Sequence, residues 1–326
     1  MAVRITLACA ESDRTLPLIL GDVRPQGIDL VFLRLPPEET FWRMLRHHEF
    51  DAAEMSLSSY VIRRSRGEDD LVAIPVFPSR QFRHSGIFVR ADAGIAAPAD
   101  LKGKRMGVPE YQVTAAVWMR GFLQDDYGVA PTDLRWFQGG LLQPGRAEKQ
   151  PIRVPGLDLR PIGPDQTLSE LLLAGELDAI MAPRAPAHVD GVRIRRLFPD
   201  YRAVEADYFR RTGIFPIMHT LVVRRDVLDS QPWVARSLYD AFCHAKAIAM
   251  ARLGEMVALA VSLPWQIAEW EATRTLMGED YWPYGLEANR VTLEALVRYS
   301  VDQGLAERWL EIEALFAPST LDEFRV

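Results

Sequence analysis

Two arginines, a histidine and a serine lie within six residues of one another, in the segment Arg80-Gln-Phe-Arg83-His84-Ser85. The apolar run at 86–89 follows them and predicts a buried strand. α/β folds place ligand sites at the ends of such strands. Guanidinium groups bind carboxylates through paired hydrogen bonds, and an imidazole can carry a proton near neutral pH. The segment therefore predicts a site for a small anion, and the alternative is a surface loop of solvated charges.

Two further candidates for proton transfer, Glu54 and His219, belong to separate predicted strands. Glu54 lies near the end of a short strand that runs into a helix, and its carboxylate could accept a proton. The alternative is a carboxylate that stabilises the start of that helix, near Ser56. His219 lies in the apolar stretch 215–224, where the alternative is a hydrogen-bonded core histidine.

A third group of residues occupies loops that precede predicted helices or follow predicted strands. Free backbone amides at the start of a helix favour an anion, and hydroxyl side chains add donors. Glu110 in one of these loops opposes an anion, unless it serves as an acid or a base. The group consists of Tyr111, Gln112 and Thr114 at the start of the predicted helix 114–123, Ser12 and Arg14 after the first strand, and Arg184 after the strand 177–181.

The histidines and cysteines do not have the spacing of a metal site. A metal assembled from the distant residues His84, His219 and Glu54 stays open as an alternative. Cys9 and Cys243 are far apart in the chain, and nothing in their surroundings favours a disulfide. We therefore expect no metal.

The elements that must position these residues alternate between strands and helices over the first two thirds of the chain. A Gly-, Pro- and Gln-rich stretch at 139–156 predicts an excursion within a domain. This alternation predicts an α/β protein. The predicted strands are 3–8, 27–33, 51–56, 71–76, 177–181 and 215–224, and the predicted helices are 13–20, 36–48, 114–123 and 168–174.

From residue 231 onward the pattern is almost purely helical, with helices predicted at 233–259 and 265–277 and a last pair within 287–316. Trp265, Trp270 and Trp309 lie in this tail. They could bury a face between copies of the chain in a homo-oligomer, or they could close the core of the first domain.

Length and charge exclude several classes of protein. A chain of 326 residues exceeds one comfortable core and predicts two domains. The net charge of −6 and the pI near 5.6 argue against a nucleic-acid-binding protein. No run approaches the roughly 20 apolar residues that cross a bilayer. The N-terminal residues lack the pattern of a secretory signal, so we expect a cytoplasmic protein.

Two motifs in this order of elements resemble the type II periplasmic binding proteins: Asp100-Leu-Lys-Gly-Lys-Arg-Met-Gly-Val, and Gly175-Glu-Leu-Asp-Ala-Ile. The resemblance implies a two-lobed α/β fold with two crossover strands, at 87–89 and 221–223, and a helical C-terminal tail. Lobe I would comprise 1–88 and 222–326, lobe II would comprise 89–221, and the ligand cleft would lie between them. His84 and His219 would then both face the cleft.

Four further segments resemble the 4,5-dihydroxyphthalate decarboxylase family: Asp51-Ala-Ala-Glu-Met-Ser, Phe77-Pro-Ser-Arg-Gln-Phe-Arg-His-Ser, Gly107-Val-Pro-Glu-Tyr, and Ala182-Pro-Arg-Ala-Pro. This family has the binding-protein fold and consists of cytoplasmic enzymes that remove one carboxylate from an aromatic diacid without an organic cofactor. The resemblance implies a carboxy-lyase that converts 4,5-dihydroxyphthalate to protocatechuate and carbon dioxide by protonating the ring.

The resemblance also implies roles for the candidate residues. Proton transfer would fall to His84, His219 and Glu54, and the substrate would be bound by Arg80, Arg83, Ser85, Arg14, Ser56, Tyr111, Gln112, Thr114 and Arg184. The alternative is a binding protein that passes a small aromatic or carboxylate anion to an ABC-type importer. A third alternative is a pyrimidine-synthesising protein of the thiamine-precursor type, although the histidine- and cysteine-dense loop of those proteins is not found here.

Overall fold

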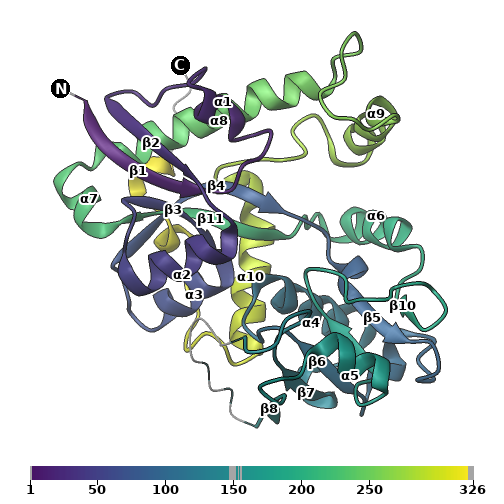
Figure 1. Ribbon diagram of the computed structural model, residues 1–326. Helices are drawn as coiled ribbons and strands as arrows, with labels where there is room; N and C mark the ends of the chain where they lie inside the picture. Colours follow the sequence, from purple (N-terminus) through teal and green to yellow (C-terminus); the bar gives the residue numbers. More distant parts are fainter. Residues whose placement is uncertain (1, 147–151, 153, 155, 322–326) are drawn as a thin grey trace. The chain divides into compact units, whose positions relative to one another are not determined.

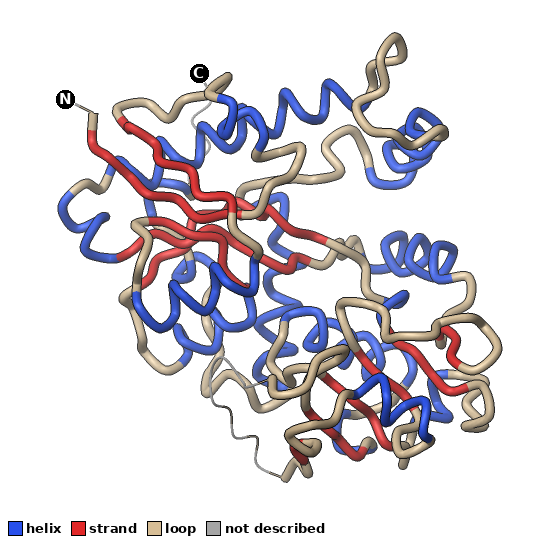
Figure 2. Tube along the Cα trace, viewed as in Figure 1, coloured by secondary structure: helices blue, strands red, loops and turns tan. Residues whose placement is uncertain are grey.

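The computed structural model describes residues 2–146, 152, 154 and 156–321 (Figure 1). The chain divides into two compact units. Unit 1 comprises 1–80, 217–294 and 310–326, and unit 2 comprises 81–216 and 295–309. Each unit is built on its own sheet, drawn red in Figure 2, so the predicted α/β class is confirmed.

The sheet of unit 1 has five strands in the order β2-β1-β3-β11-β4. β1 pairs with β2 and β3 in parallel, whereas β11 pairs with β3 and β4 in antiparallel. The return of the chain through β11 therefore inserts a late segment between two early strands. The strands are β1 (Val3–Cys9), β2 (Ile28–Arg34), β3 (Ala52–Ser56), β4 (Leu71–Arg80) and β11 (Ile217–Arg224).

Helices cover both faces of this sheet, with α2 and α3 on one face and α8 on the other (Figure 1). Strands covered on both faces are generally rich in apolar residues, and every residue of β3 is buried. Glu54 is therefore a carboxylate in the middle of a core strand. The helices are α1 (Leu16–Leu20), α2 (Pro37–His47), α3 (Leu57–Ser65), α7 (Arg225–Ser230), α8 (Trp233–Leu253), α9 (Gln266–Met277) and the start of α10 (Arg290–Asp302), whose residues from Ala295 onward belong to unit 2, with 3-10 turns η4 (Glu287–Asn289), η5 (Ile312–Leu315) and η6 (Pro318–Thr320).

The sheet of unit 2 has six strands in the order β10-β5-β9-β6-β7-β8. β6 pairs in parallel with β7 and β9, and β7 pairs in parallel with β8. β5 runs antiparallel to β9 and β10. The strands are β5 (Ile87–Arg90), β6 (Arg105–Val108), β7 (Arg135–Gln138), β8 (Leu159–Pro161), β9 (Ala179–Met181) and β10 (Ile194–Arg196).

Two helices, α4 and α5, pack into the core of unit 2. α5 has a capping box, in which Thr167 and Glu170 each bond to the other's backbone amide, and it ends at the left-handed Gly175. Its leucines pack on Phe88 and Ile180. The first ten residues of α4 are all buried. The helices are α4 (Thr114–Tyr127), α5 (Leu168–Ala174) and α6 (Tyr201–Thr212), with 3-10 turns η1 (His84–Gly86), η2 (Pro98–Leu101) and η3 (Pro131–Asp133).

The division of the chain differs from the expected lobes in three places. Residues 217–221, which include His219, belong to unit 1 and not to the second lobe, because β11 pairs with β3 and β4. The segment from Gln81 belongs to unit 2, so Arg83, His84 and Ser85 lie in unit 2 and not with Arg80. Residues 295–309 also belong to unit 2, although the whole tail was expected in lobe I. The reason is that Gln303 bonds to Arg120 and to the backbone of Val117, both in α4.

Some predicted elements end at different residues. The long tail helix ends at Leu253 and not at 259, and the last predicted pair consists of α10 followed by 3-10 turns. The chain leaves α10 near the left-handed Gly304, a conformation that interrupts a helix. Residues 185–214 have no predicted element, whereas the structure has β10 and α6 there. The predicted excursion 139–156 falls partly outside the described residues.

Candidate functional site

Glu54 and His219 form a hydrogen-bonded pair in unit 1. They lie on the adjacent antiparallel strands β3 and β11, where Ser56 pairs with His219 and Glu54 pairs with Leu221. Glu54 and His219 are therefore diagonal neighbours on one face, within reach of long side chains. The distance from Glu54 Oε1 to His219 Nδ1 is 2.6 Å. Glu54 is 1% exposed, whereas the His219 side chain is 18% exposed.

The second oxygen of Glu54 is also bonded. Oε2 accepts the backbone N–H of Ala10 at 2.9 Å and the thiol of Cys9 at 3.4 Å. Burial by itself raises the pKa of Glu54, but the hydrogen bond and charge of His219, with these two donors, lower it below its usual value. Burial and the Glu54 carboxylate raise the pKa of Cys9 well above its usual value. Cys9 is thus a neutral thiol that donates to an ionised carboxylate.

The bond to Glu54 determines which nitrogen of His219 is available for chemistry. A carboxylate at Nδ1 holds the proton there and leaves Nε2 to gain or lose a proton. Nε2 makes no hydrogen bond to any residue that the structure describes. The ring of Phe41 lies edge-on to the imidazole, with centroids 4.9 Å apart at 84°, and restricts its rotation. His219 is therefore an oriented imidazole with one ring nitrogen not engaged by the described chain.

Hydroxyl groups lie next to this pair at the start of α3. Ser56 is the direct cross-strand partner of His219 and also precedes the first residue of the helix. Its Oγ lies 3.3 Å from Ser58 Oγ and 3.2 Å from Ser59 Oγ. Hydroxyl groups at a helix N-terminus favour a bound anion.

Arg14 lies in the loop after β1 and is held in a fixed plane. Its guanidinium stacks on the Trp282 ring at 4.0 Å, and it donates to the backbone oxygen of Pro78 at 3.1 Å. Asp13 Oδ1 lies 2.5 Å from its Nη1 and offsets part of its charge. Arg14 remains a candidate for binding a carboxylate, with a preset orientation.

Arg80 contacts the loop before α10. Its side chain is buried and donates to Asn289 Oδ1 at 2.7 Å and to the carbonyl of Pro283 at 3.1 Å. Burial lowers its pKa to about 9. These contacts give Arg80 a structural role in unit 1, and substrate binding by Arg80 stays a prediction.

His84 is packed among aromatic rings in unit 2. It stacks on Phe122 with centroids 3.9 Å apart, and the rings of Phe198 and Tyr208 meet it edge-on. Burial lowers its pKa to about 4. Both properties favour a neutral core histidine, and proton transfer by His84 stays a prediction.

Arg83 and Ser85 flank His84. Arg83 is buried and donates to the carbonyl of Pro183 at 3.3 Å, next to the exposed Arg184. Burial lowers the pKa of Arg83 to about 10. The backbone N–H of Ser85 donates to Glu205 Oε1 at 3.2 Å, so a carboxylate of α6 holds this turn. Unit 2 thus brings the turn that contains Arg83 next to the segment 183–184. The Arg184 side chain makes no hydrogen bond or ion pair with other described residues.

Tyr111, Gln112 and Thr114 lie in unit 2, where α4 begins, and all three are buried. The Tyr111 ring packs under the guanidinium of Arg120 at 3.7 Å. The carboxylate of Glu110, which opposed an anion in this loop, pairs with Arg146 at 2.5 Å. This ion pair offsets the negative charge of Glu110, so anion binding by the loop stays a prediction.

Several contacts that build the site could not be recognised in the sequence. Cys9, Phe41 and Glu205 touch predicted site residues, but isolated residues of these types carry no pattern.

No group of three or more His, Cys, Asp or Glu side chains among the described residues could hold a metal ion. No helix of the described chain is long and apolar enough to cross a membrane.

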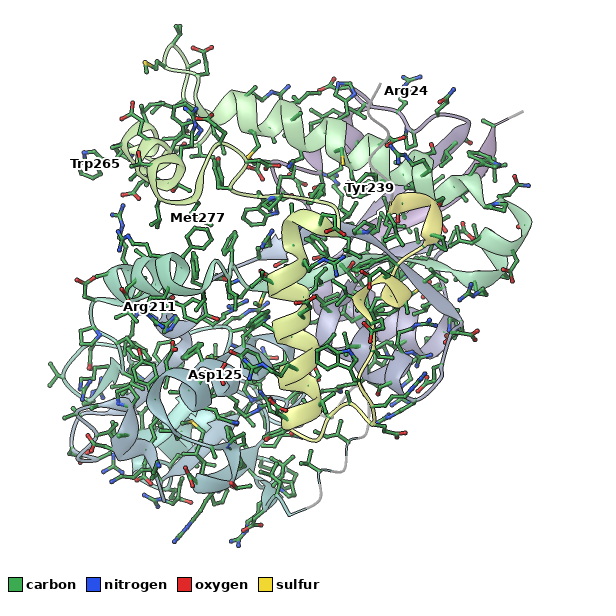
Figure 3. The ribbon with its side chains drawn as sticks, turned by 180° about the vertical axis from the view of Figure 1, so that it is seen from behind. Arg24, Asp125, Arg211, Tyr239, Trp265 and Met277 are labelled. Carbon is green, nitrogen blue, oxygen red and sulfur yellow. The ribbon has the colours of Figure 1, made fainter. Side chains whose placement is uncertain are left out.

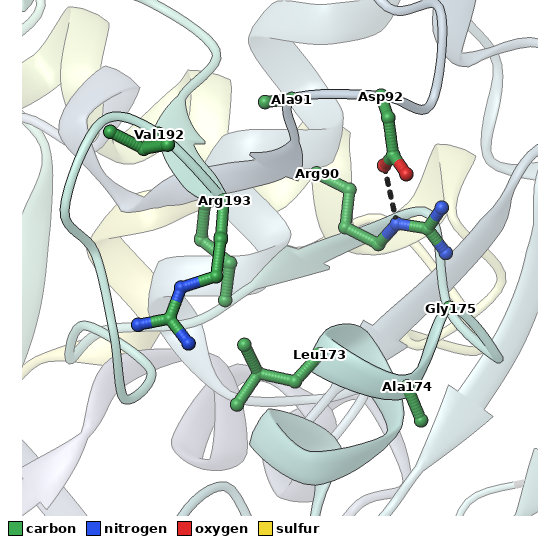
Figure 4. A pocket seen from close by; sticks show the side chains of 9 residues that line it. Arg90, Ala91, Asp92, Leu173, Ala174, Gly175, Val192 and Arg193 are labelled. Atoms are coloured by element: carbon green, nitrogen blue, oxygen red, sulfur yellow. Dashed lines mark hydrogen bonds and ion pairs between the residues drawn. The ribbon is translucent and has the colours of Figure 1, made fainter.

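A separate hollow of about 350 Å³ lies on unit 2, between Leu173–Gly175 and Val192–Ile194 (Figure 4). Its two arginines are already paired, Arg90 with Asp92 at 2.8 Å and Arg193 with Asp190 at 3.0 Å. None of the predicted site residues lines it.

Two α/β units of this topology define a protein of the periplasmic-binding-protein fold. The periplasmic aliphatic sulphonate binding protein of Escherichia coli matches with a TM-score of 0.54 and 13% identity, over 98% of this chain and 99% of that one. At this identity the likeness shows the fold alone. A family model described as NMT1/THI5 like matches residues 24–140.

Sequence comparison identifies the family within this fold. A 4,5-dihydroxyphthalate decarboxylase of Comamonas testosteroni is 42% identical over 99% of both chains. A second protein with this name, from Pseudomonas putida, is 42% identical over 64% of this chain and 82% of its own. The chain belongs to the 4,5-dihydroxyphthalate decarboxylase family.

Proposed function

We propose that this protein is a carboxy-lyase that converts 4,5-dihydroxyphthalate to protocatechuate and carbon dioxide. The observation that supports this most strongly is the 42% identity to a decarboxylase of that name over 99% of both chains. The Glu54–His219 pair adds a chemical reason, because it is an oriented acid–base pair in a polar corner of unit 1.

The reaction replaces a carboxylate on the ring by a proton. The C–COO⁻ bond breaks and its electron pair remains on the ring carbon, which takes up a proton, while the carboxylate departs as CO₂. The hydroxyl group para to that carbon donates electron density and lets the ring accept the proton first. No electrons are gained or lost overall, so the step needs an acid but no oxidant or reductant.

His219 is the proton donor in this proposal. When protonated, its Nε2–H delivers the proton to the ring carbon, and the ionised Glu54 at Nδ1 stabilises the imidazolium. Glu54 does not itself contact the substrate, because both of its oxygens are bonded within unit 1. Glu54 is therefore a positioning residue, which differs from the direct role in proton transfer that the sequence suggested.

The carboxylate that remains on the ring needs a cationic partner. Arg14 is the first choice in unit 1, since Trp282 and Pro78 already fix its plane, and Ser56 offers a hydroxyl beside His219. Arg83, Arg184 and the start of α4 in unit 2 are further binding candidates. Ser85 and Arg80 bind structural partners, so we give them lower priority.

The second hypothesis is a binding protein that delivers an anion to an importer. The fold favours this hypothesis. The buried carboxylate–imidazole pair does not, because a protein that only binds and releases an anion has no need of such a pair. Tight binding of 4,5-dihydroxyphthalate without turnover would support it.

The test is to mix purified protein with 4,5-dihydroxyphthalate, with and without a chelator, and to follow CO₂ release and the ultraviolet spectrum of the ring. We expect turnover in both cases, a loss of about 10²–10⁴-fold in kcat for His219→Asn, and little change for His244→Asn. His244 is the matched control because it is exposed on α8. Full activity of His219→Asn would refute the assignment of the proton donor, and turnover lost with the chelator would indicate a metal.

This proposal includes a place in the cell and a state of assembly. We expect a cytoplasmic protein that acts in phthalate degradation, and a homo-oligomer. Fractionation of the native host, with activity measured in each fraction, tests the location.

A further inference from the structure

The loop between α8 and α9 exposes an unusual number of large apolar side chains. Residues 256–265 contain no charged residue. We call these ten residues the apolar loop. In the structure the loop projects beyond the ends of the two helices (Figure 1), and Figure 3 marks its last residue, Trp265. The exposed fractions range from 45% to 95% for Met256, Val257, Leu259, Val261, Leu263 and Trp265.

Specific contacts hold the loop in its shape. The buried Gln266 donates to the backbone oxygen of Leu253 at 2.8 Å and accepts the N–H of Val261 at 2.9 Å, so it joins the two ends of the loop. Gly254 lies so close to the Trp270 ring that a Cβ atom there would come within 2.8 Å of it. The apolar side chains are therefore displayed on a formed loop.

The exposed area lies at the upper end of the range for a monomer. With roughly 150–200 Å² for each residue of this size when fully exposed, the six side chains expose about 600 Å². The largest apolar patch of a typical monomer is about 300–600 Å². A standard protein interface buries about 800 Å² on each partner. The apolar loop thus supplies most of the area that one side of a stable interface needs.

We propose that the apolar loop is the contact surface between two copies of this chain. A two-fold contact sets the same patch against itself, so an uncharged patch meets an uncharged patch and no charge is buried. The net charge of −6 on each copy opposes association overall, so the burial of uncharged apolar surface has to supply the favourable free energy.

The residues that flank the loop fit such a contact. Arg252 and Glu255 precede it, and Glu269, Glu271 and Arg274 follow it in α9. Because these flanking residues include both positive and negative charges, positive side chains of one copy can face negative side chains of the other across a two-fold contact. A partner of one strong charge would instead be repelled by the residues of like charge in this rim.

The test compares the mass in solution of the full chain and two variants by analytical ultracentrifugation between 0.5 and 100 µM. We expect the wild-type protein to self-associate, and Val257→Glu to weaken association by at least about 100-fold, because each interface would bury two unpaired carboxylates. Val192→Glu is the matched control, since Val192 is 77% exposed in unit 2. Thermal unfolding shows whether both variants are folded.

Two results would overturn the proposal. One is a wild-type protein that stays monomeric up to 100 µM, and the other is an unchanged mass for a folded Val257→Glu variant. A membrane surface is the competing assignment, and flotation with vesicles of phosphatidylcholine and phosphatidylglycerol tests it. If the wild-type protein is a monomer that floats with the vesicles and Val257→Glu does not float, the loop binds a membrane surface instead. These measurements do not depend on decarboxylation. A monomeric protein would remove the contact surface and the homo-oligomer but leave the proposed reaction standing, and a protein without decarboxylase activity would leave the contact surface standing.

Discussion

Glu54 remains ionised in the core because three donors surround it. A buried carboxylate without partners would take up a proton, since burial disfavours the charged form. Here His219 bonds to one oxygen, and Ala10 and Cys9 bond to the other. The carboxylate in turn orients His219, so the state of Glu54 determines how the imidazole behaves.

Removal of the Cys9 thiol should change the pH dependence of catalysis. We expect Cys9→Ala to raise the pKa of Glu54, because one donor to the carboxylate is lost. The acid limb of kcat/KM should then move to higher pH by roughly 0.3–0.5 unit, if the thiol contributes about 0.5 kcal/mol. Cys9→Ser retains a donor and should restore the wild-type limb.

The control for this prediction is Cys243→Ser, at the half-buried cysteine of α8. A purely structural role of Cys9 would lower the melting temperature of Cys9→Ala without moving the pH limb. That result would contradict the positioning role.

At the scale of elements, the turn η1 depends on its packing against α4 and α6. His84 provides the ring that stacks on Phe122 of α4 and meets Tyr208 of α6. Glu205 of α6 holds the backbone of the same turn. A histidine in such a place contributes to stability only while it is neutral.

The stability of the protein should therefore fall in mild acid because of His84. Its pKa is about 4 in the folded state and about 6.5 in an unfolded chain. The unfolded state thus binds a proton first as the pH falls, so the loss begins near pH 6.5 and is complete below about pH 4. A shift of this size corresponds to about 3 kcal/mol.

Urea unfolding at pH 7, 5.5 and 4 checks this prediction. His84→Phe keeps an aromatic ring in place and should show a flatter dependence of the unfolding free energy on pH. An equal slope in the variant would assign the acid sensitivity to other groups. If His84→Phe is folded but has lost activity, His84 is the proton donor after all.

The loop before α10 depends on its hydrogen bonds to Arg80. Asn289→Ala removes the side-chain acceptor of Arg80, keeps the backbone acceptor of Pro283 and leaves the charge of Arg80 in place. Arg80→Met removes the charge and keeps most of the side-chain volume. If Arg80 holds this loop, both variants should lose about 1–3 kcal/mol of stability and keep KM within a few-fold. A large rise in KM for Arg80→Met alone would assign the arginine to substrate binding.

At the scale of the whole molecule, a ligand that binds the folded chain should stabilise it. Phthalate has both carboxylates of the proposed substrate but lacks the hydroxyl groups that donate electron density. We therefore expect phthalate to bind without turnover and to inhibit competitively. It should add about 1.4 kcal/mol of stability at ten times its Kd.

Thermal unfolding with increasing phthalate measures this effect. Arg14→Met should remove most of the shift in melting temperature, whereas Arg24→Met, at an exposed position near Gly21, should keep it. An equal shift in both variants would exclude Arg14 as the partner of a carboxylate. A turnover of phthalate would contradict the requirement for the hydroxyl groups.

The sequence alone determined the fold class, the family resemblance and the presence of Glu54 and His219 among the catalytic candidates. These follow from local patterns, because apolar periodicity and short motifs lie within a few neighbouring residues. Helix α5 was predicted with its observed bounds, since Thr167 and Gly175 are capping signals next to it in the chain.

Only the tertiary structure decided which candidates meet. Glu54 and His219 are 165 residues apart in the chain, and the register of β3 against β11 brings them together. The same long-range packing puts His84 among aromatic rings and Arg80 against Asn289. A hydrogen bond between strands that are far apart in the sequence depends on which residues become neighbours in the folded chain, and so does the burial of a charge. The residues next to it in the sequence do not specify those neighbours.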